Sequence, residues 1–468
     1  RSPLAWEMFF PFPIVEQNTK GYKRRVKKTD FMMFFQRKLI PGLDLVHPIQ
    51  STDPEECLLI TPFSLKSLLY SYMARIPSYE DYLKGSHGVQ FNQVDAYGRE
   101  VGHIDDFLPI NPEPGKNLVT TIDINIQSSL ENLMMGKKGV VIVGIPETGE
   151  ILGVVSKPDF PPDLFTGRIL KQDWNHVSTN PDKPLLNRFN QGLYPPGSIV
   201  KMITEAVLLD NEDFDPSAQL KCDGSYQYGD RVFGCWLTEG HGNVDLTSAL
   251  MQSCDIYFYK TVQYYDLDKL AQFFRAFGFG EVTDIDIGRE YKGTIPTVAY
   301  MNKRYGRSGW SRGALLNFCI GQGEILVTPI QVFNYTNLLA TNGEAKSPHL
   351  VLSTKKEIKS SLVLNSKTWE RIVFDMNQVI KNINGTGKNA DPLIEGVNVY
   401  GKTGTAENPH GEDHAWFIGW LEYDSQKISV VVLLENAGSG GVVAAPLARS
   451  AFKNILNNLM STGQISSK

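Results

Sequence analysis

At 468 residues, the chain is long enough to bury a full hydrophobic core, and its length favours more than one domain. The formal net charge of -5 gives no reason to expect a nucleic acid as a partner. Five cysteines are too few for a disulfide scaffold, although three of them lie close together in the chain and need their own explanation.

Residues 1 to about 75 give the weakest pattern. Prolines interrupt them and no period of 2 or 3.6 persists, so we expect a loosely structured or partner-dependent region. We expect the basic cluster Lys20–Lys28 to be a solvated face, with anionic lipid or a phosphate as the alternative. No segment reaches the roughly 18 apolar residues that a membrane span requires. The chain starts at Arg1 instead of Met, so we expect that an anchor or signal has been removed ahead of it.

The pattern becomes clearer after this region. A short helix is predicted over Tyr79–Leu83, ended by Gly85, and a hairpin over Val89–Gly102. A proline-rich linker follows, and we place the main domain boundary within Asn111–Asp123. This divides the chain into residues 1–75, a small segment 76–117 and a main domain 118–468.

The main domain begins and ends with strands and is helical in between. A strand pair, a helical middle, three more strands and a final helix favour one sheet assembled from both ends of the domain, with helices on both faces. The predicted elements are a strand at Leu118–Ile122, a helix at Asn125–Met135, hairpin arms at Gly139–Ile145 and Ile151–Ser156, helices at Leu246–Tyr265, Leu267–Phe277 and Thr328–Thr341, strands at Val399–Ala406, Trp416–Tyr423 and Ile428–Leu434, and a helix at Ala445–Leu459.

One stretch of the middle part, Tyr194–Lys201, brings a nucleophile beside a base. Two prolines and Gly197 stop the preceding segment, and an almost unbroken apolar run then predicts a helix that lies inside the domain. Ser198 and Lys201 are three residues apart in its first turn, so their side chains share one face.

The Ser-x-x-Lys pair is weak evidence by itself, because it should occur roughly twice by chance in a chain of this length. Two further copies begin at Ser353, in a charged segment, and at Ser450, in an amphipathic helix. Neither follows a Pro-Pro-Gly turn or precedes a buried run, so the context selects Ser198.

Two more stretches complete a pattern of three motifs. Ser253-Cys254-Asp255 lies in the helical middle, and Lys402-Thr403-Gly404-Thr405 lies on a strand whose glycines permit close approach of another backbone. The order Ser-x-x-Lys, Ser-x-Asp, Lys-Thr-Gly resembles that of the penicillin-binding proteins and serine β-lactamases. The resemblance is closest to the monofunctional, class B transpeptidases of the elongation type. It extends from about Ser78 to the C-terminus and includes Tyr79–Tyr82, Val94–Arg99, Leu185–Arg188, Gly321–Gly323 and Val327–Pro329.

The resemblance implies the fold: an α+β transpeptidase domain with an antiparallel sheet flanked by helices on both faces. It also implies that segment 76–117 is a smaller N-terminal pedestal or dimerisation-like part. Residues 1–75 do not show the opening segments expected of the family.

The chemistry of acyl transfer assigns the first roles. Ser198 is a weak nucleophile unless an adjacent base takes its proton, and Lys201 is the nearest candidate. To act as a base, Lys201 must be neutral. Burial in an apolar pocket and the nearby cationic Lys402 would both lower its pKa.

By resemblance, Ser253 relays a proton to the leaving amine, and Asp255 orients the side chains of Ser253 and Lys201. Asn is common at the position of Asp255, but elongation-type members can carry Asp.

The strand motif is expected to bind the substrate. The backbone N–H groups of Ser198 and Thr405 would form an oxyanion hole, to which the helix start adds its dipole. Lys402 and Thr403, followed by Gly404, would bind the terminal carboxylate of a peptide that ends in D-Ala-D-Ala.

The cysteine cluster forms a Cys-x12-Cys-x5-His-x12-Cys series whose members are Cys222, Cys235, His241 and Cys254. Cys3His is a common tetrahedral zinc set, although the short Cys-x2-Cys pairs of zinc ribbons are missing. Some elongation-type transpeptidases look similar here and carry a structural zinc, so we expect one. The alternatives are a disulfide between Cys222 and Cys235, or three independent buried thiols.

The sequence therefore predicts an extracytoplasmic peptidoglycan D,D-transpeptidase, a target of β-lactams, at the outer face of the cytoplasmic membrane. Its expected partners are stem peptides and a membrane glycan polymerase of the elongation machinery. One alternative is hydrolytic, a D,D-carboxypeptidase or a β-lactamase, but the deacylating Glu motif of class A β-lactamases is not found between Asp255 and Lys402. Another alternative is a non-catalytic scaffold that binds wall peptides.

Overall fold

The computed structural model describes residues 110–461 apart from 166–168, 353–357, 362–363 and 410, together with parts of 79–103 and the strand β1 (Arg25–Lys27). The predictions for residues 1–75, including the basic cluster and Cys57, otherwise lie outside the described residues. Of the described residues, those up to Leu118 belong to one compact unit and those from Val119 onward to a second. No helix in the described part of the chain is long and apolar enough to cross a membrane.

The first unit contains the predicted hairpin. Its strands β2 (Gln90–Val94) and β3 (Glu100–His103) pair antiparallel, and β1 adds to the other edge of β2. The backbone at Gly85 has a φ of +63°, and a Cβ there would lie 2.2 Å from the carbonyl oxygen of Glu113. Glycine is therefore required at this turn.

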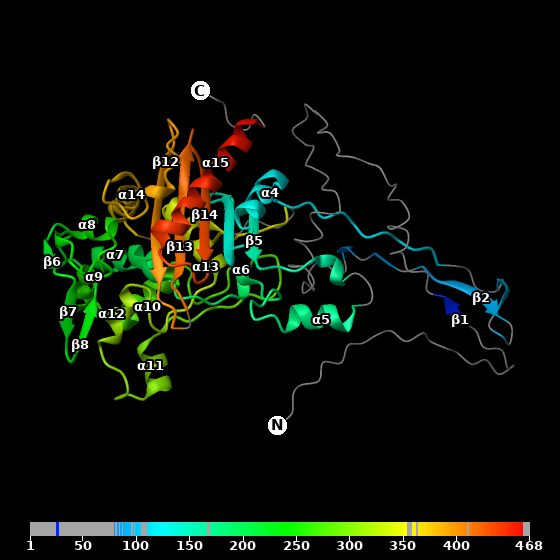
Figure 1. Cartoon of the computed structure of the whole chain (residues 1–468), viewed down its shortest axis with the longest axis horizontal. Coiled ribbons are helices and arrows are strands. Elements are labelled where there is room, and N and C mark those ends of the chain that lie inside the picture. The colour runs from blue at the N-terminus through cyan, green and yellow to red at the C-terminus, as the bar shows by residue number, and fades with distance from the viewer. Residues whose placement is uncertain are drawn as a thin grey trace. The chain divides into compact units, whose positions relative to one another are not determined.

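The second unit is built on a five-stranded antiparallel sheet in the order β12-β13-β14-β4-β5 (Figure 1). The N-terminal hairpin of the domain pairs with its C-terminal strands through β4 and β14, so the prediction of one sheet assembled from both ends is confirmed. The strands are β4 (Gly139–Ile145), β5 (Glu150–Lys157), β12 (Asn398–Ala406), β13 (His414–Tyr423) and β14 (Gln426–Leu434).

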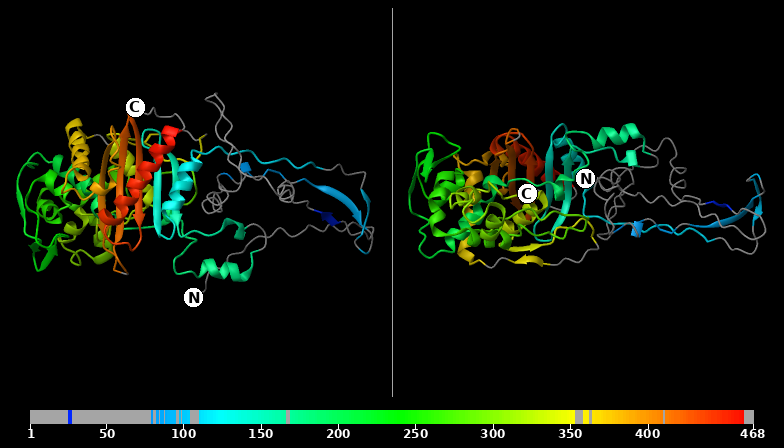
Figure 2. Two further views of the ribbon diagram at one scale, coloured as in Figure 1. Left: turned by 45° about the horizontal axis from the view of Figure 1, so that its top comes forward. Right: turned by 90° about the horizontal axis from the view of Figure 1, so that it is seen from below.

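Helices cover both faces of this sheet, as predicted (Figures 1 and 2). Helices α4 (Ile124–Leu133) and α15 (Ala445–Ser461) pack against one face and against each other. Helix α13 (Pro329–Ala340) packs against the other face, and all of its residues are buried. It begins with a capping box of Thr328 and Gln331, which satisfies amide groups that this buried helix end would otherwise leave unpaired.

The helical middle of the domain lies beside the β12 edge of the sheet (Figure 1). Its central helix, α7 (Lys201–Leu209), is apolar nearly all round and almost entirely buried, as predicted. The other elements of the unit are η1 (Pro162–Phe165), α5 (Lys171–Ser178), α6 (Arg188–Gln191), η2 (Gly197–Val200), α7 (Lys201–Leu209), β6 (Leu220–Cys222), β7 (Ser225–Tyr228), β8 (Arg231–Gly234), β9 (Gly242–Val244), α8 (Leu246–Met251), α9 (Asp255–Thr261), η3 (Val262–Tyr264), α10 (Leu267–Ala276), α11 (Val298–Tyr305), α12 (Ala314–Cys319), β10 (Glu344–Lys346), β11 (Ile358–Ser361), α14 (Ser366–Lys381), η4 (Lys388–Ala390) and η5 (Gly440–Ala444).

The predicted strand at Leu118–Ile122 is wrong, because the structure has only an isolated bridge between Thr120 and Val351 there. The amide groups of Leu350 and Val351 donate to the carboxylate of Asp286, at 2.8 to 3.1 Å. The segment that faces Thr120 therefore has part of its backbone hydrogen-bonded to a side chain, and a longer pair of strands does not form. Sequence periodicity cannot reveal such a competing acceptor.

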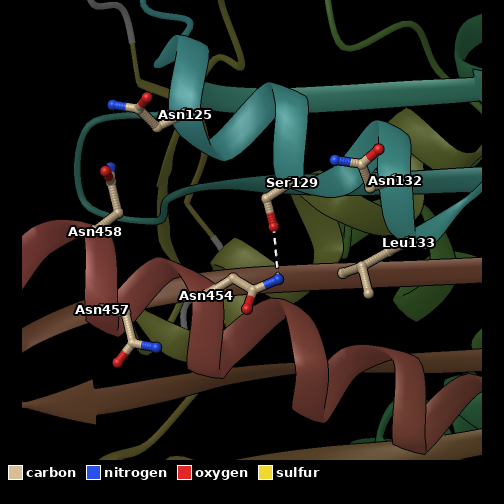
Figure 3. Close-up of a pocket in the computed structure, with 7 residues that line it drawn as sticks. All are labelled: Asn125, Ser129, Asn132, Leu133, Asn454, Asn457 and Asn458. Carbon is tan, nitrogen blue, oxygen red and sulfur yellow. Dashed lines mark hydrogen bonds between the residues drawn. The ribbon is translucent and has the colours of Figure 1, made fainter.

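A shallow groove of about 700 Å³ runs between α4 and α15 (Figure 3). Asn454 bridges it by donating a hydrogen bond to Ser129, at 2.6 Å. None of its lining side chains is ionisable, so the groove offers no acid, base or strong nucleophile. The lining residues are Asn125, Ser129, Asn132, Leu133, Asn454, Asn457 and Asn458.

Candidate active site and metal centre

The segment around Ser198 is a tight turn that leads into α7. Gly197 has a φ of +58° and begins a 3-10 turn, and α7 continues from Lys201. In a 3-10 turn, side chains three residues apart eclipse each other. Ser198 and Lys201 therefore leave the same side of the turn, which is a tighter alignment than the α-helical start predicted from sequence.

Four backbone or side-chain contacts hold this turn in place. The Trp416 indole donates to the carbonyl of Pro195 at 3.1 Å, and the amide of Gly197 donates to Gly321 at 2.9 Å. Tyr194 pairs with Val327 through its backbone and donates its hydroxyl to Glu435 at 2.6 Å. The segments Gly321–Gly323 and Val327–Pro329, which carry part of the family resemblance, thus act as supports for the turn.

Lys201 is fully buried, with 0% of its surface exposed, and its amine has three oxygen neighbours. It lies 2.9 Å from the carbonyl oxygen of Ser253, 3.2 Å from the Ser253 hydroxyl and 2.8 Å from Oδ1 of Asp255. The role of Asp255 in orienting Lys201 stays a prediction, but the contact that it requires is present.

Ser253 lies at a break between two helices. The predicted continuous helix Leu246–Tyr265 is wrong, because α8 ends at Met251 and α9 begins at Asp255. Ser253 itself has a φ of +56°, in the left-handed region that non-glycine residues seldom adopt. Such strain is maintained only where the surroundings impose it. The break turns the Ser253 hydroxyl toward both lysines.

Lys402 is the second buried lysine, also 0% exposed, and it approaches Ser253 from β12. Its amine lies 2.9 Å from the Ser253 hydroxyl and 3.0 Å from the carbonyl oxygen of Thr403. Burial and then the charge of Lys201 hold the pKa of Lys402 well below its ordinary value, while Asp255 acts in the opposite direction. The Ser253 hydroxyl is consequently shared by two amines.

Strand β12 makes its closest approach to the nucleophile turn at Gly404. A Cβ there would lie 2.8 Å from Cγ2 of Ile199 and 3.2 Å from the carbonyl oxygen of Pro196, while one on Gly197 would lie 2.8 Å from the carbonyl oxygen of Thr405. These two glycines allow strand and turn to touch through their backbones. The amides predicted as the oxyanion hole, those of Ser198 and Thr405, belong to these two touching segments.

Within the described part of the chain, no hydrogen bond joins the Ser198 hydroxyl to the Lys201 amine, which contacts Ser253 and Asp255 instead. Catalytic hydrogen bonds are often long or misaligned before the substrate binds. Asp255, by contrast, is fully engaged: Oδ1 pairs with Lys201 and Oδ2 accepts from the amide of Trp236 at 3.3 Å.

The four predicted metal ligands come together, and their ligand atoms all lie within 4.8 Å of one another. Nδ1 of His241 is 3.6 Å from Sγ of Cys222 and 3.5 Å from Sγ of Cys235. The cysteine thiols are free, so the structure does not form the alternative disulfide between Cys222 and Cys235. This set of three buried cysteines and a half-buried histidine fits a tetrahedral zinc ion.

Electrostatics within the cluster already favour a thiolate. A hydrogen bond from Cys254 and another from His241 lower the pKa of Cys235 to about 2. Cys319 is separate from this cluster, because its thiol is fully buried and donates to the carbonyl of Leu316.

A further buried acid lies one turn along α7 from Lys201. Glu205 is fully buried, and its carboxyl group lies beside that of Asp375, without a hydrogen bond of standard geometry to any described residue. Burial and then the charge of Asp375 raise its pKa well above the ordinary value. The sequence alone does not mark Glu205 as buried, since an acid in an apolar helical run could equally face solvent.

Comparison with known proteins agrees with the order of the motifs. Residues 139–456 match the family model described as the penicillin binding protein transpeptidase domain, and since this is more than half of the chain, the chain belongs to that family. The peptidoglycan D,D-transpeptidase MrdA of Haemophilus influenzae is 34% identical over 412 residues, which cover 81% of this chain and 62% of the relative. The Escherichia coli K12 protein of the same name is 29% identical over 409 residues, or 82% of this chain and 63% of the relative. The chain thus spans a little over three-fifths of the length of these relatives.

Solved structures show the same fold. PBP2 of Helicobacter pylori in complex with MreC has a TM-score of 0.72 at 30% identity, covering 83% of this chain and 71% of the other. PBP2 of Pseudomonas aeruginosa in complex with WCK 5153 has a TM-score of 0.69 at 31% identity, covering 81% of this chain and 80% of the other.

Proposed function

We propose that the chain carries the active site of a peptidoglycan D,D-transpeptidase that acts through an acyl-enzyme on Ser198. The observation that carries the proposal is the convergence of Lys201 and Lys402 on the hydroxyl of Ser253, beside the turn that presents Ser198. Membership of the transpeptidase family and the printed activity of the relatives support it.

The distances suggest a direction for proton movement. A neutral Lys201 has two N–H donors and one lone pair. The donors can serve Asp255 and the carbonyl of Ser253, which leaves the lone pair for the Ser198 proton during attack on the penultimate D-Ala carbonyl. The hydroxyl of Ser253 lies between Lys201 and Lys402 and can pass that proton to the departing D-Ala amine.

The second half-reaction regenerates Ser198. An amine from a neighbouring stem peptide attacks the acyl carbonyl, a proton leaves the attacking nitrogen, and Ser198 recovers its hydrogen. The amides of Ser198 and Thr405 would stabilise the oxyanion in both half-reactions. Lys402 and Thr403 would hold the terminal carboxylate of the donor peptide, and Gly404 keeps the strand in contact with the turn.

The arrangement supports transfer to an amine over hydrolysis. A hydrolase needs a base that activates water. In the described residues, the carboxylate in contact with this cluster is that of Asp255, and both of its oxygens are already engaged. This disfavours a deacylating base of the β-lactamase kind.

Intact mass after incubation with a β-lactam tests the proposal. We expect one stable adduct per chain, located on Ser198 and absent from Ser198→Ala. The matched control is Ser450→Ala, since Ser450 belongs to another Ser-x-x-Lys copy but lies on α15, where its hydroxyl donates to Pro446. Labelling at Ser450, or no labelling under conditions in which a known transpeptidase is labelled, would overturn the proposal. Rapid turnover of the β-lactam would favour the hydrolase instead.

We also propose a structural zinc ion held by Cys222, Cys235, His241 and Cys254. The ion would supply a fixed tetrahedral link between these chain segments. Cys254 lies between Ser253 and Asp255, so the link would help maintain the strained turn of Ser253.

Metal analysis and thermal unfolding test the zinc site independently of activity. We expect one zinc per chain, a lower melting temperature after chelation, and loss of the metal in Cys235→Ser. Cys319→Ser should retain the metal, because Cys319 is outside the cluster. Protein purified without chelator that contains no zinc would refute the site.

The cellular location and the partner proteins are proposed from similar proteins. One neighbour is solved with MreC, and another belongs to a structure described as a peptidoglycan synthase complex that coordinates polymerization and crosslinking. We propose that this chain likewise works outside the cytoplasmic membrane with a glycan polymerase. Co-purification of the two from membranes, lost when residues 1–117 are deleted, would support this.

A further inference from the structure

The loop that follows α14 is a tightly built Gly385-Thr386-Gly387 turn. A Cβ on Gly385 would lie 2.2 Å from the carbonyl oxygen of Val379, and one on Gly387 would lie 2.8 Å from Cδ1 of Ile380. The amide of Gly387 also donates to the carbonyl of Val379 at 3.0 Å. Glycine is required at Gly385, where a Cβ would meet backbone, and the loop folds closely onto the end of the helix, which fixes the position of Thr386.

Thr386 links the Thr403 strand to the end of α8, just before the Ser253 turn. Its amide donates to the carbonyl of Met251, the last residue of α8 before the Ser253 turn, at 3.3 Å. Its hydroxyl is 2.7 Å from the hydroxyl of Thr403 on β12. Thr386 is half-buried, whereas Thr403 is only 5% exposed. In the free protein, the buried Thr403 hydroxyl donates its hydrogen to the Thr386 hydroxyl.

We propose that Thr386 is a positioning residue for recognition of the substrate carboxylate. This inference rests on the proposed transpeptidase function, in which Thr403 contacts that carboxylate. A hydroxyl has one donor hydrogen and two acceptor positions. When Thr403 turns its hydrogen toward the carboxylate, the bond between the two hydroxyls reverses, and the Thr403 oxygen accepts a hydrogen from the Thr386 hydroxyl 2.7 Å away. Thr386 would then polarise and orient Thr403 through a chain of two hydroxyls.

The alternative role for Thr386 is purely structural, as a link between β12 and the end of α8. The two roles differ in ligand dependence. A structural loss would slow every acylation of Ser198 alike. A loss of carboxylate recognition would affect only ligands that carry the carboxylate.

The experiment compares Thr386→Val and Thr386→Ser with the parent chain. Valine keeps the shape and removes the hydroxyl, and serine restores the hydroxyl. The probes are benzylpenicillin and its methyl ester, in which an uncharged ester replaces the carboxylate. We expect Thr386→Val to lower the second-order acylation rate with benzylpenicillin about fivefold, the usual effect of one hydrogen bond between neutral groups. The methyl ester should react with Thr386→Val at the same rate as with the parent chain. For both probes, the acylation rate of Thr386→Ser should lie within about twofold of the parent rate.

Three results would overturn the inference: an unchanged rate with benzylpenicillin in Thr386→Val, an equal loss with both probes, or failure of serine to restore the rate. Melting temperatures of the variants show whether a loss reflects unfolding. The proposed function fails separately, since it requires labelling of the parent at Ser198. Labelling of the parent combined with any of the three results refutes the role of Thr386 alone.

Discussion

Replacing Gly404 with alanine should weaken the proposed oxyanion hole while the chemical groups of the site remain present. The new Cβ would lie 2.8 Å from Cγ2 of Ile199 and 3.2 Å from the carbonyl oxygen of Pro196. Carbon atoms in contact are normally about 3.5 Å apart or more, so strand and turn must separate by roughly 0.7 Å at the tighter contact. The amides of Ser198 and Thr405 lie on the two segments that separate.

The expected magnitudes follow from this displacement. Overpacking of this kind costs about 1–3 kcal/mol of folding free energy. Loss of one complete oxyanion donor costs about 10²–10³ in rate. Since the displacement weakens such a bond without removing it, we expect acylation of Ser198 in Gly404→Ala to be about 10- to 100-fold slower than in the parent.

The assay is the rate of labelling by a fluorescent penicillin, with the fraction of competent protein determined by prolonged labelling. Gly234→Ala is the matched control, because a Cβ on Gly234 meets nothing within 4 Å. It should acylate at the parent rate. If folded Gly404→Ala were labelled within twofold of the parent rate, the strand would not limit the geometry of the oxyanion hole, and the argument from close approach would be refuted.

Two other predictions concern buried ionisable groups: the lysines of the site, and Glu205 on α7. Lys201→Ala should abolish acylation, because Ser198 then keeps its proton. Lys402→Ala should chiefly weaken recognition of the substrate carboxylate. If Lys201→Ala were acylated at near the parent rate, another base would be required. Glu205→Gln should make the protein more stable than the parent above about pH 4.5, because the parent retains a proton on buried Glu205 that the unfolded chain releases. Between the unfolded pKa of 4.5 and the raised folded pKa, the advantage should grow by about 1.4 kcal/mol per pH unit, and below pH 4.5 it should vanish. Urea unfolding from pH 4 to pH 8 measures this, and a difference that does not change with pH would contradict it.

The order of the motifs and the elements that carry them were readable from the sequence. Pro-Pro-Gly before an apolar run marked the nucleophile turn, and runs of Val and Ile marked the strands that became the centre of the sheet. These features are local, since proline, glycine and hydrophobic periodicity act on the backbone within a few residues. The four members of the candidate metal site were also visible, because few residue types ligate zinc.

What the sequence could not decide arises from contacts between distant segments. The left-handed turn at Ser253 interrupts a sequence that reads as one helix, and it is stabilised by lysines far away in the chain, Lys201 and Lys402. Thr386 gives no signal of its own, because the importance of its hydroxyl depends on Thr403 lying 2.7 Å away. The sequence by itself therefore indicated which residues are candidates for the chemistry. Tertiary packing alone decided how their protons and charges are shared, because hydrogen bonds and charge interactions depend on distances that local periodicity does not encode.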